Sequence, residues 1–170
     1  LEFRRVLFRS DCEAVIADID ARFGGLSALV ANAGIAPRAA YPILTDAKWD
    51  EVLNVNLKGQ LRLIRAAAPA MSARQQGAIV CVSSIAGAVV GWDDHWHYSA
   101  AKAGITGMVK ASACALAKSN VRVNAVAPGW IASSGMDTYT GDFKEQIPKL
   151  RGYCPLGRLG TPLPTLSGGR

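Results

Sequence analysis

The alternation of helical stretches with short apolar runs constrains the fold of this chain more than any other feature of its sequence. Three segments carry apolar residues at helical spacing, and each is followed by an apolar run that leads into Asn, Ser or Pro. Because parallel strands need crossover helices, this order predicts an α/β fold with a parallel sheet covered on both faces. The predicted helices span residues 11–23, 46–74 and 98–118, and the predicted strands span residues 26–31, 78–83 and 121–127.

Start and stop signals support these helices. Gly24 and Gly25 follow the first one, and glycine readily adopts the backbone conformation that ends a helix. Thr45 precedes the second, where its hydroxyl can cap a backbone N–H. No linker divides the chain, so we expect one domain. In a parallel sheet, ligands gather at the carboxyl ends of the strands, which is where we expect the functional residues.

The composition predicts a soluble globular protein. Half of the residues are apolar, 19% are charged and the mean hydropathy is +0.16, which excludes a disordered, collagen-like or coiled-coil chain. The longest uncharged stretch, residues 75–92, is too polar for the run of about 20 mainly apolar residues that a membrane span requires. The four cysteines are widely spaced, which fits reduced thiols in the cytoplasm better than a disulfide framework or a metal site.

The net charge of +6 raises the question of a nucleic-acid partner. The basic residues are scattered, however, and the only dense basic run lies in the first ten residues, LEFRRVLFRS. This segment has no helical or strand period and resembles the translation of a synthetic sequencing adaptor; the alternative is a genuine basic arm. Residues 1–10 are left out of the fold on either interpretation. Without them the net charge is +4, and we expect no nucleic-acid partner.

Tyr98 and Lys102 form the most informative pair, because four residues of helix place both side chains on one face. A phenol has an ordinary pKa of about 10 and is a reluctant proton donor at neutral pH. A nearby ammonium favours the phenolate and lowers that pKa. A serine hydroxyl after the second strand, from Ser83 or Ser84, can donate to a substrate oxygen. These groups suit the reduction of a carbonyl by hydride transfer.

The ordered motifs N-A-G, N-V-N-L-K-G, V-S-S, Y-S-A-A-K and R-V-N-A-V-A-P-G resemble those of the short-chain dehydrogenases/reductases, especially the ketoacyl-carrier-protein reductase type. The resemblance covers about residues 11–162. It implies a Rossmann-like, doubly wound parallel sheet, NAD or NADP as the cofactor, a small carbonyl or alcohol substrate, and a homodimer or homotetramer. Its catalytic set falls on Asn56, Ser84, Tyr98 and Lys102, with Asn56 expected to hold a water that links the lysine to solvent.

The same resemblance implies a set of cofactor-binding residues, but it does not decide whether Ser83 or Ser84 is the active serine. Ser84 and Ser83 lie fourteen and fifteen residues before Tyr98, where the family commonly has thirteen. We choose Ser84 as the active hydroxyl and expect Ser83 to bond back to the strand end. Ala31 stands where the family usually has a further Asn, and Ser133 where it has Thr. The expected cofactor-binding residues are Asn32, Ala33, Gly34, Tyr98, Lys102, Pro128, Gly129, Ile131 and Ser133.

Parts of the family fold have no counterpart in this sequence. No Gly-rich turn that could bind a phosphate occurs, and the resemblance begins at the helix before the family's fourth strand. We therefore expect a partial fold, without the first three strands and the last strand. Residues 11–162 are expected to form the catalytic part of the dinucleotide-binding domain, and residues 163–170 an out-of-frame tail. An intact catalytic set favours an oxidoreductase, while the missing phosphate turn favours the alternative, a non-catalytic interaction module.

The segment G-W-D-D-H-W-H-Y contains a candidate metal cluster of Asp93, Asp94, His95 and His97. Neighbouring residues on a loop seldom converge on one ion, and hydride transfer in the resembled family needs none, so we expect no metal. Trp92 and Trp96 either wall the substrate pocket or pack under the loop.

Overall fold

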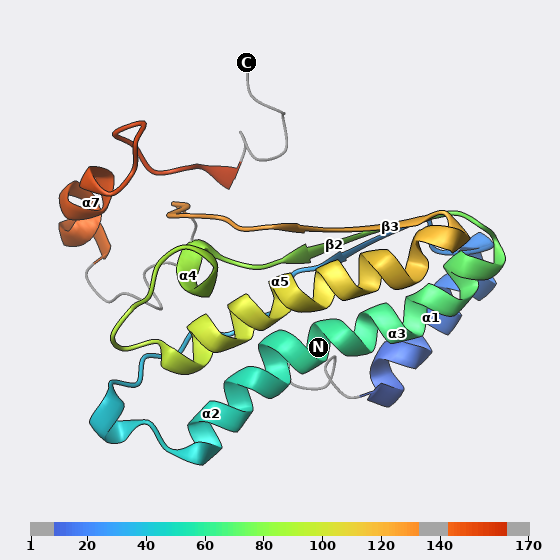
Figure 1. The fold of residues 1–170 in the computed structure, drawn as a ribbon, viewed down its shortest axis with the longest axis horizontal. Helices are drawn as coiled ribbons and strands as arrows, with labels where there is room; N and C mark the ends of the chain where they lie inside the picture. Colours follow the sequence, from blue (N-terminus) through green and yellow to red (C-terminus); the bar gives the residue numbers. More distant parts are fainter. Residues whose placement is uncertain (1–8, 133–142, 163–170) are drawn as a thin grey trace. The chain divides into compact units, whose positions relative to one another are not determined.

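In the computed structural model, residues 9–132 and 143–162 are described, and they belong to two compact units that divide after Ala127. The first unit contains a three-stranded parallel sheet in the order β1-β2-β3 (Figure 1). The predicted α/β fold with a parallel sheet is thereby confirmed. The elements of this unit are α1 (Arg9–Phe23), β1 (Ala28–Ala31), η2 (Tyr41–Ile43), α2 (Asp46–Leu53), η3 (Asn54–Lys58), α3 (Gly59–Ala73), β2 (Gly77–Val82), α4 (Ile85–Ala88), α5 (Trp96–Leu116), η4 (Ala117–Ser119) and β3 (Val121–Val126).

The core of this unit lies between the sheet and helices α1, α3 and α5, all on one face of the sheet (Figure 1). Ile79 of β2 pairs in register with Leu29 and Val123 and points into this core. Alternate residues point the other way, so Val30 and Val126 are exposed on the opposite face. Within residues 9–127 no helix covers that face, whereas the sequence predicted cover on both. The reason is topological: successive right-handed crossovers that move in one direction place their helices on the same side.

Helix α1 begins at Arg9, two residues before the predicted start. Arg9 Nε lies 2.7 Å from Glu13 Oε1, one helical turn later. The helix therefore extends into residues 1–10, a segment in which the sequence has no helical period.

The long second helix is interrupted. Thr45 caps it as predicted, accepting a hydrogen bond from Lys48 N at 3.3 Å. After α2 the chain widens into a π-turn, η3, before α3 continues in the same direction. Hydrophobic periodicity cannot distinguish such a turn from an α-helix, although π-turns often occur at functional sites.

Helix α5 begins two residues before the predicted start and ends in the 3-10 turn η4. The short helix α4 packs against it, which the sequence did not predict. Gly87 makes this contact possible, because its φ is +82° and a Cβ there would collide with the backbone oxygen of Ser99.

The second unit contains α7 (Phe143–Gly152) and a bridge between Ile131 and Gly160. Leu150 and Leu159 form its small core. Ser133 and the predicted tail at residues 163–170 lie outside the described residues. Among the helices of residues 9–132 and 143–162, none has the length and hydropathy needed to cross a membrane.

Candidate active site

Lys102 lies at the carboxyl end of β2. Its side chain is only 4% exposed, and Nζ donates a hydrogen bond of 2.7 Å to the carbonyl oxygen of Val82. Gln60 Nε2 donates to the same oxygen at 3.2 Å, a contact that sequence reasoning missed. Burial lowers the pKa of Lys102 to about 8. The ammonium is therefore largely charged at neutral pH but close to its titration range.

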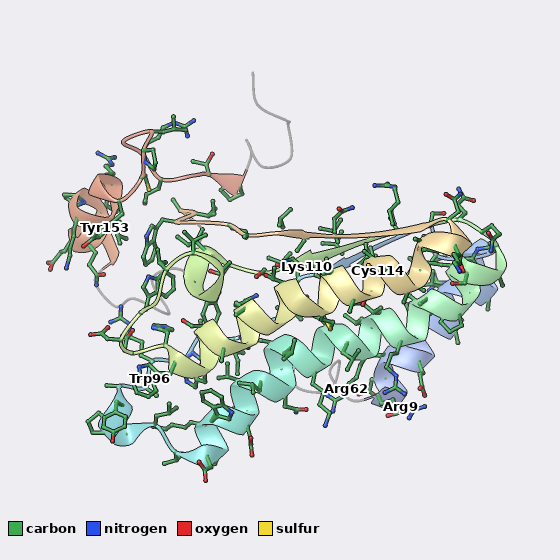
Figure 2. The ribbon with its side chains drawn as sticks, in the orientation of Figure 1. Arg9, Arg62, Trp96, Lys110, Cys114 and Tyr153 are labelled. Carbon is green, nitrogen blue, oxygen red and sulfur yellow. The ribbon has the colours of Figure 1, made fainter. Side chains whose placement is uncertain are left out.

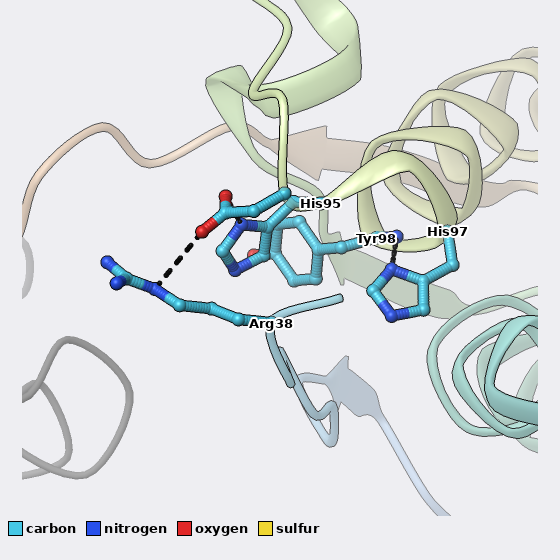
Figure 3. A network of polar contacts seen from close by, with 5 residues as sticks. Arg38, His95, His97 and Tyr98 are labelled. Carbon is cyan, nitrogen blue, oxygen red and sulfur yellow. Dashed lines mark hydrogen bonds and ion pairs between the residues drawn. The ribbon is translucent and has the colours of Figure 1, made fainter. Parts of the chain in front are cut away.

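Tyr98 lies one turn before Lys102 on α5. Lys102 Nζ is 5.6 Å from the centre of the Tyr98 ring, so the helix presents the phenol and the ammonium together. Trp92 stacks almost parallel to the ring, with centroids 6.3 Å apart and an interplanar angle of 7°. His95 meets it edge-on, with centroids 5.9 Å apart (Figure 3). The tyrosine is thus held by three neighbours.

The two serines after β2 have different partners. Ser83 continues the strand alternation, so its side chain faces the same side as Cys81 and donates a 2.7 Å hydrogen bond to the carbonyl oxygen of Lys102. The expectation that Ser83 bonds back to the strand end was wrong, because the alternation turns it toward α5. Ser84 caps α4, where Oγ accepts from Ala86 N at 3.1 Å. Since Ser84 Oγ accepts in this contact, its proton can be donated to another group.

Asn56 is fully buried in the π-turn η3 and binds the loop that follows β1. Its Nδ2 donates to the carbonyl oxygen of Ile35, and its Oδ1 accepts from Ile35 N, both at 2.8 Å. A Cβ at Gly34 would lie only 3.1 Å from Asn56 Oδ1, so the glycine allows the close approach. The side chain of Asn56 therefore positions the N-A-G loop, and its expected role in holding a water stays a prediction.

Arg38, Asp94 and His95 form a polar network beside Tyr98 (Figure 3). Asp94 Oδ1 lies 2.5 Å from His95 Nδ1, and Asp94 Oδ2 lies 3.3 Å from Arg38 Nε. The backbone N–H of Ala39 donates to the carbonyl oxygen of Asp94 at 2.9 Å. These contacts connect the loop after β1 to the loop before α5. From the sequence, Asp94 and His95 were candidates only as metal ligands.

His97 lies apart from this network. It is fully buried, Nδ1 accepts from the backbone N–H of Tyr98 at 2.9 Å, and burial lowers its pKa, which favours the neutral ring. His97 and the Asp94–His95 pair of the loop therefore have separate partners. In the part of the chain that the structure describes, no three His, Cys, Asp or Glu side chains gather as a metal site would need.

The two tryptophans lie at an open depression of about 510 Å³. Trp92 stacks on Tyr98, whereas Trp96 stacks on Tyr41 at 5.3 Å and is half exposed (Figure 2). Neither tryptophan belongs to the main core. The depression is lined by Trp49, Gly91, Trp92, Asp93, Trp96 and Ser99.

The expected cofactor residues are divided between the two units. Asn32, Ala33 and Gly34 follow β1, and the exposed Asn32 and Gly34 leave backbone accessible at the carboxyl edge of the sheet. This edge suits the nicotinamide end of a dinucleotide. Within the described ranges no Gly-rich turn is present to hold the pyrophosphate.

Pro128, Gly129 and Ile131 lie in the second unit, where Gly160 N donates to the carbonyl oxygen of Trp130 at 2.9 Å. Of these positions, Ile131 forms the bridge to Gly160.

Ala31, which stands where the family usually has Asn, is fully buried at the end of β1. Cys81 is also buried, which raises the pKa of its thiol to about 11 and keeps it protonated at neutral pH.

A parallel sheet with an adjacent Tyr and Lys at its carboxyl edge is typical of a short-chain dehydrogenase/reductase. A family model described as enoyl-(acyl carrier protein) reductase matches residues 6–165, and the chain belongs to this family. Within the family it is similar to ketoacyl-carrier-protein reductases. It is 39% identical over 150 residues to the 3-oxoacyl-[acyl-carrier-protein] reductase FabG of Staphylococcus aureus (strain N315), an alignment that covers 88% of this chain and 59% of the relative.

Other relatives support the same family. The acetoacetyl-CoA reductase of Synechocystis sp. is 42% identical over 149 residues, covering 88% of this chain and 60% of the relative. A solved structure described as ElxO with NADP bound matches with a TM-score of 0.87 and 27% identity, over 96% of this chain and 66% of that one. The chain thus spans about three fifths of the length of the curated relatives.

Proposed function

We propose that this chain supplies the catalytic part of an oxidoreductase that transfers a hydride between a nicotinamide cofactor and a carbonyl or secondary alcohol. The observation that carries the proposal is the placement of Lys102: its buried ammonium lies 5.6 Å from the centre of the Tyr98 ring, at the carboxyl edge of the sheet. A cation there favours the phenolate form of Tyr98 and so eases proton transfer at neutral pH. The nicotinamide, when bound, supplies the hydride.

Each of the four expected catalytic residues has a distinct task in this proposal. Tyr98 donates its phenolic proton to the oxygen of the substrate carbonyl as negative charge develops there. Ser84 donates a hydrogen bond to the same oxygen and orients it. Lys102 supports the phenolate and is held in place by the Val82 carbonyl. Asn56 orders the loop after β1.

The cofactor is proposed to be NAD or NADP, and its nicotinamide end to contact Tyr98 and Lys102. Of the proposed residues on the first unit, Asn32 and Gly34 are exposed and Ala33 between them is half-buried. Pro128, Gly129, Ile131 and Ser133 complete the proposed set from the sequence pattern. The known relatives named as 3-oxoacyl and acetoacetyl reductases favour a small β-ketone as the substrate. We further propose a cytoplasmic homodimer or homotetramer, with residues 1–10 and 163–170 outside the functional domain.

Tyr98→Phe tests this function in the full-length protein that contains the chain. The variant keeps the ring but removes the proton donor, so we expect the rate of ketone reduction to fall about 100-fold or more. The reaction is followed by the loss of NADH or NADPH absorbance with an acetoacetyl thioester as substrate. Tyr153→Phe, at an exposed tyrosine (Figure 2), is the matched control and should keep the wild-type rate. A Tyr98→Phe protein with more than half of the wild-type kcat would contradict the proposal and favour a non-catalytic interaction module.

A further inference from the structure

The contact between His95 and Asp94 determines which imidazole nitrogen carries the proton. His95 Nδ1 lies 2.5 Å from Asp94 Oδ1. An ionised carboxylate can only accept hydrogen bonds, so Nδ1 must be the donor. In the neutral imidazole the second nitrogen, Nε2, then has a lone pair and no proton. A neutral His95 therefore presents a hydrogen-bond acceptor at Nε2.

The orientation of this imidazole is restrained on several sides. Arg38 binds the second carboxylate oxygen of Asp94, and Ala39 N binds the Asp94 backbone. The His95 ring is buried and meets Trp92 and Tyr98 edge-on, with centroids 5.5 and 5.9 Å away. A ring held by a hydrogen bond and two aromatic neighbours loses little further entropy when a ligand binds, which favours a specific contact.

Nε2 of His95 is available for such a contact. Among the described residues, none is hydrogen-bonded to it. Nε2 of His97, by contrast, is enclosed and unpaired. Figure 3 shows the His95 ring beside the end of the Tyr98 ring that lies farthest from its backbone. The imidazole that carries the acceptor nitrogen and the phenol ring of Tyr98 are therefore direct neighbours.

We infer that His95 is a specificity-determining residue, whose Nε2 accepts a hydrogen bond from a substrate hydroxyl or amide N–H next to the reacting carbonyl. This inference rests on the proposed function, in which Tyr98 and Ser84 both donate to the carbonyl oxygen. With two donors directed at that oxygen, an acceptor nearby selects a different substrate group, one that carries a proton. Among otherwise similar ketones, those with such a donor close to the carbonyl should be reduced with the higher kcat/KM.

The test compares ketones that differ only in this donor. Hydroxyacetone and methoxyacetone form one pair, and a β-hydroxy ketone and its methyl ether form another. One net hydrogen bond corresponds to a preference of about fivefold in kcat/KM. We expect the full-length protein to favour the hydroxy ketone of at least one pair by about this factor. His95→Phe keeps an aromatic ring without an acceptor, so the ratio of kcat/KM for the hydroxy ketone to kcat/KM for its methyl ether should fall to about 1.

Two further variants separate hydrogen bonding from packing. His95→Gln keeps an acceptor and should retain part of the preference. Asp94→Asn lets the amide donate to Nδ1, which moves the imidazole proton to Nε2 and should reduce the preference. Asp50→Asn, which removes the same charge at an exposed position of α2, is the control and should leave the preference unchanged. Thermal denaturation verifies that each variant is folded. If His95→Phe does not fold, the substrate preference of Asp94→Asn tests the inference instead.

Two results would overturn the inference: a wild-type protein without preference in either pair, or a His95→Phe variant that loses activity equally on both members. These results are distinguishable from failure of the proposed function, which depends on Tyr98→Phe. If Tyr98→Phe is inactive but the wild type shows no preference for the donor group, the proposed function stands and the role of His95 is refuted.

Discussion

At the scale of single residues, the candidate site contains a conflict between catalysis and stability. Lys102 is a buried cation whose nearest hydrogen-bond acceptor is a neutral carbonyl oxygen. Burial lowers its pKa from the ordinary 10.5 to about 8, and each pKa unit corresponds to 1.36 kcal/mol. Keeping the side chain charged in the fold therefore costs on the order of 3 kcal/mol. Functional sites commonly reduce stability in this way.

Lys102→Met is accordingly expected to stabilise the protein while abolishing ketone reduction. Below pH 8 the folded wild type carries the buried charge, so the variant should gain up to about 3 kcal/mol in free energy of unfolding. Between pH 8 and pH 10.5 the folded lysine is neutral while the unfolded one is still protonated, so the free energy of unfolding of the wild type rises with pH. The difference in this free energy between Lys102→Met and the wild type therefore becomes smaller. Denaturant titrations of the full-length wild type and variant at pH 7 and pH 10 measure this difference. Lys110→Met, at an exposed lysine of α5 (Figure 2), should change little; a destabilised Lys102→Met protein at pH 7 would refute the expectation.

At the scale of elements, helix α5 has two faces with different tasks. Tyr98 and Lys102 lie on the face that borders the site, and Ile105 packs into the core. The small residues of α5 are divided between faces. A Cβ at Gly104 would meet Leu57 of η3 at 2.8 Å, whereas Gly107 has open space around it. The small residues that remain exposed are Ala103, Gly107, Ala111 and Ala115.

We expect this exposed small-residue face to pair with a second copy of the protein. Gly107→Trp places a large ring where close helix approach is needed, so it should shift the full-length protein from a dimer or tetramer toward a monomer at micromolar concentration. Light scattering gives the mass. Ala17→Trp, at an exposed position of α1, adds the same ring elsewhere and should leave the mass unchanged. A wild-type protein that is already monomeric would count against the pairing.

At the scale of the whole molecule, the described sheet is covered on one face only. Val30 is 66% exposed and Val126 46% exposed on the opposite face. β1 pairs only with β2 among the described strands, so its other edge lies open. An apolar strand with an open edge and an uncovered face is prone to associate with other chains.

Residues 11–170 expressed alone should therefore aggregate or remain loosely packed, and should bind neither NADH nor NADPH. The chain has exposed apolar strand surface, and no described helix N-terminus follows a Gly-rich turn that could receive the pyrophosphate. Size-exclusion chromatography and fluorescence titration test both statements. Val30→Lys is expected to improve solubility without creating affinity for either cofactor. A soluble monomer with micromolar affinity for NADH or NADPH would show that the prediction is mistaken.

Local patterns in the sequence were sufficient to predict the parallel α/β fold, because periodicity and helix caps depend on residues a few positions apart. Thr45 and Lys48 are three residues apart, and their contact was predictable from spacing. The π-turn at Asn54–Lys58 was not, because its hydrophobic pattern is that of an α-helix.

Only the tertiary structure decided the partners within the site. Ser83 binds the carbonyl of Lys102 nineteen residues away, and Asn56 binds Ile35 twenty-one residues away. The Asp94–His95 pair is local in sequence, but its place beside Tyr98 and its link to Arg38 depend on how two loops meet at the sheet edge. Spacing along the chain determines which face of an element a side chain occupies. The group opposite that face is determined by the packing of elements distant in sequence.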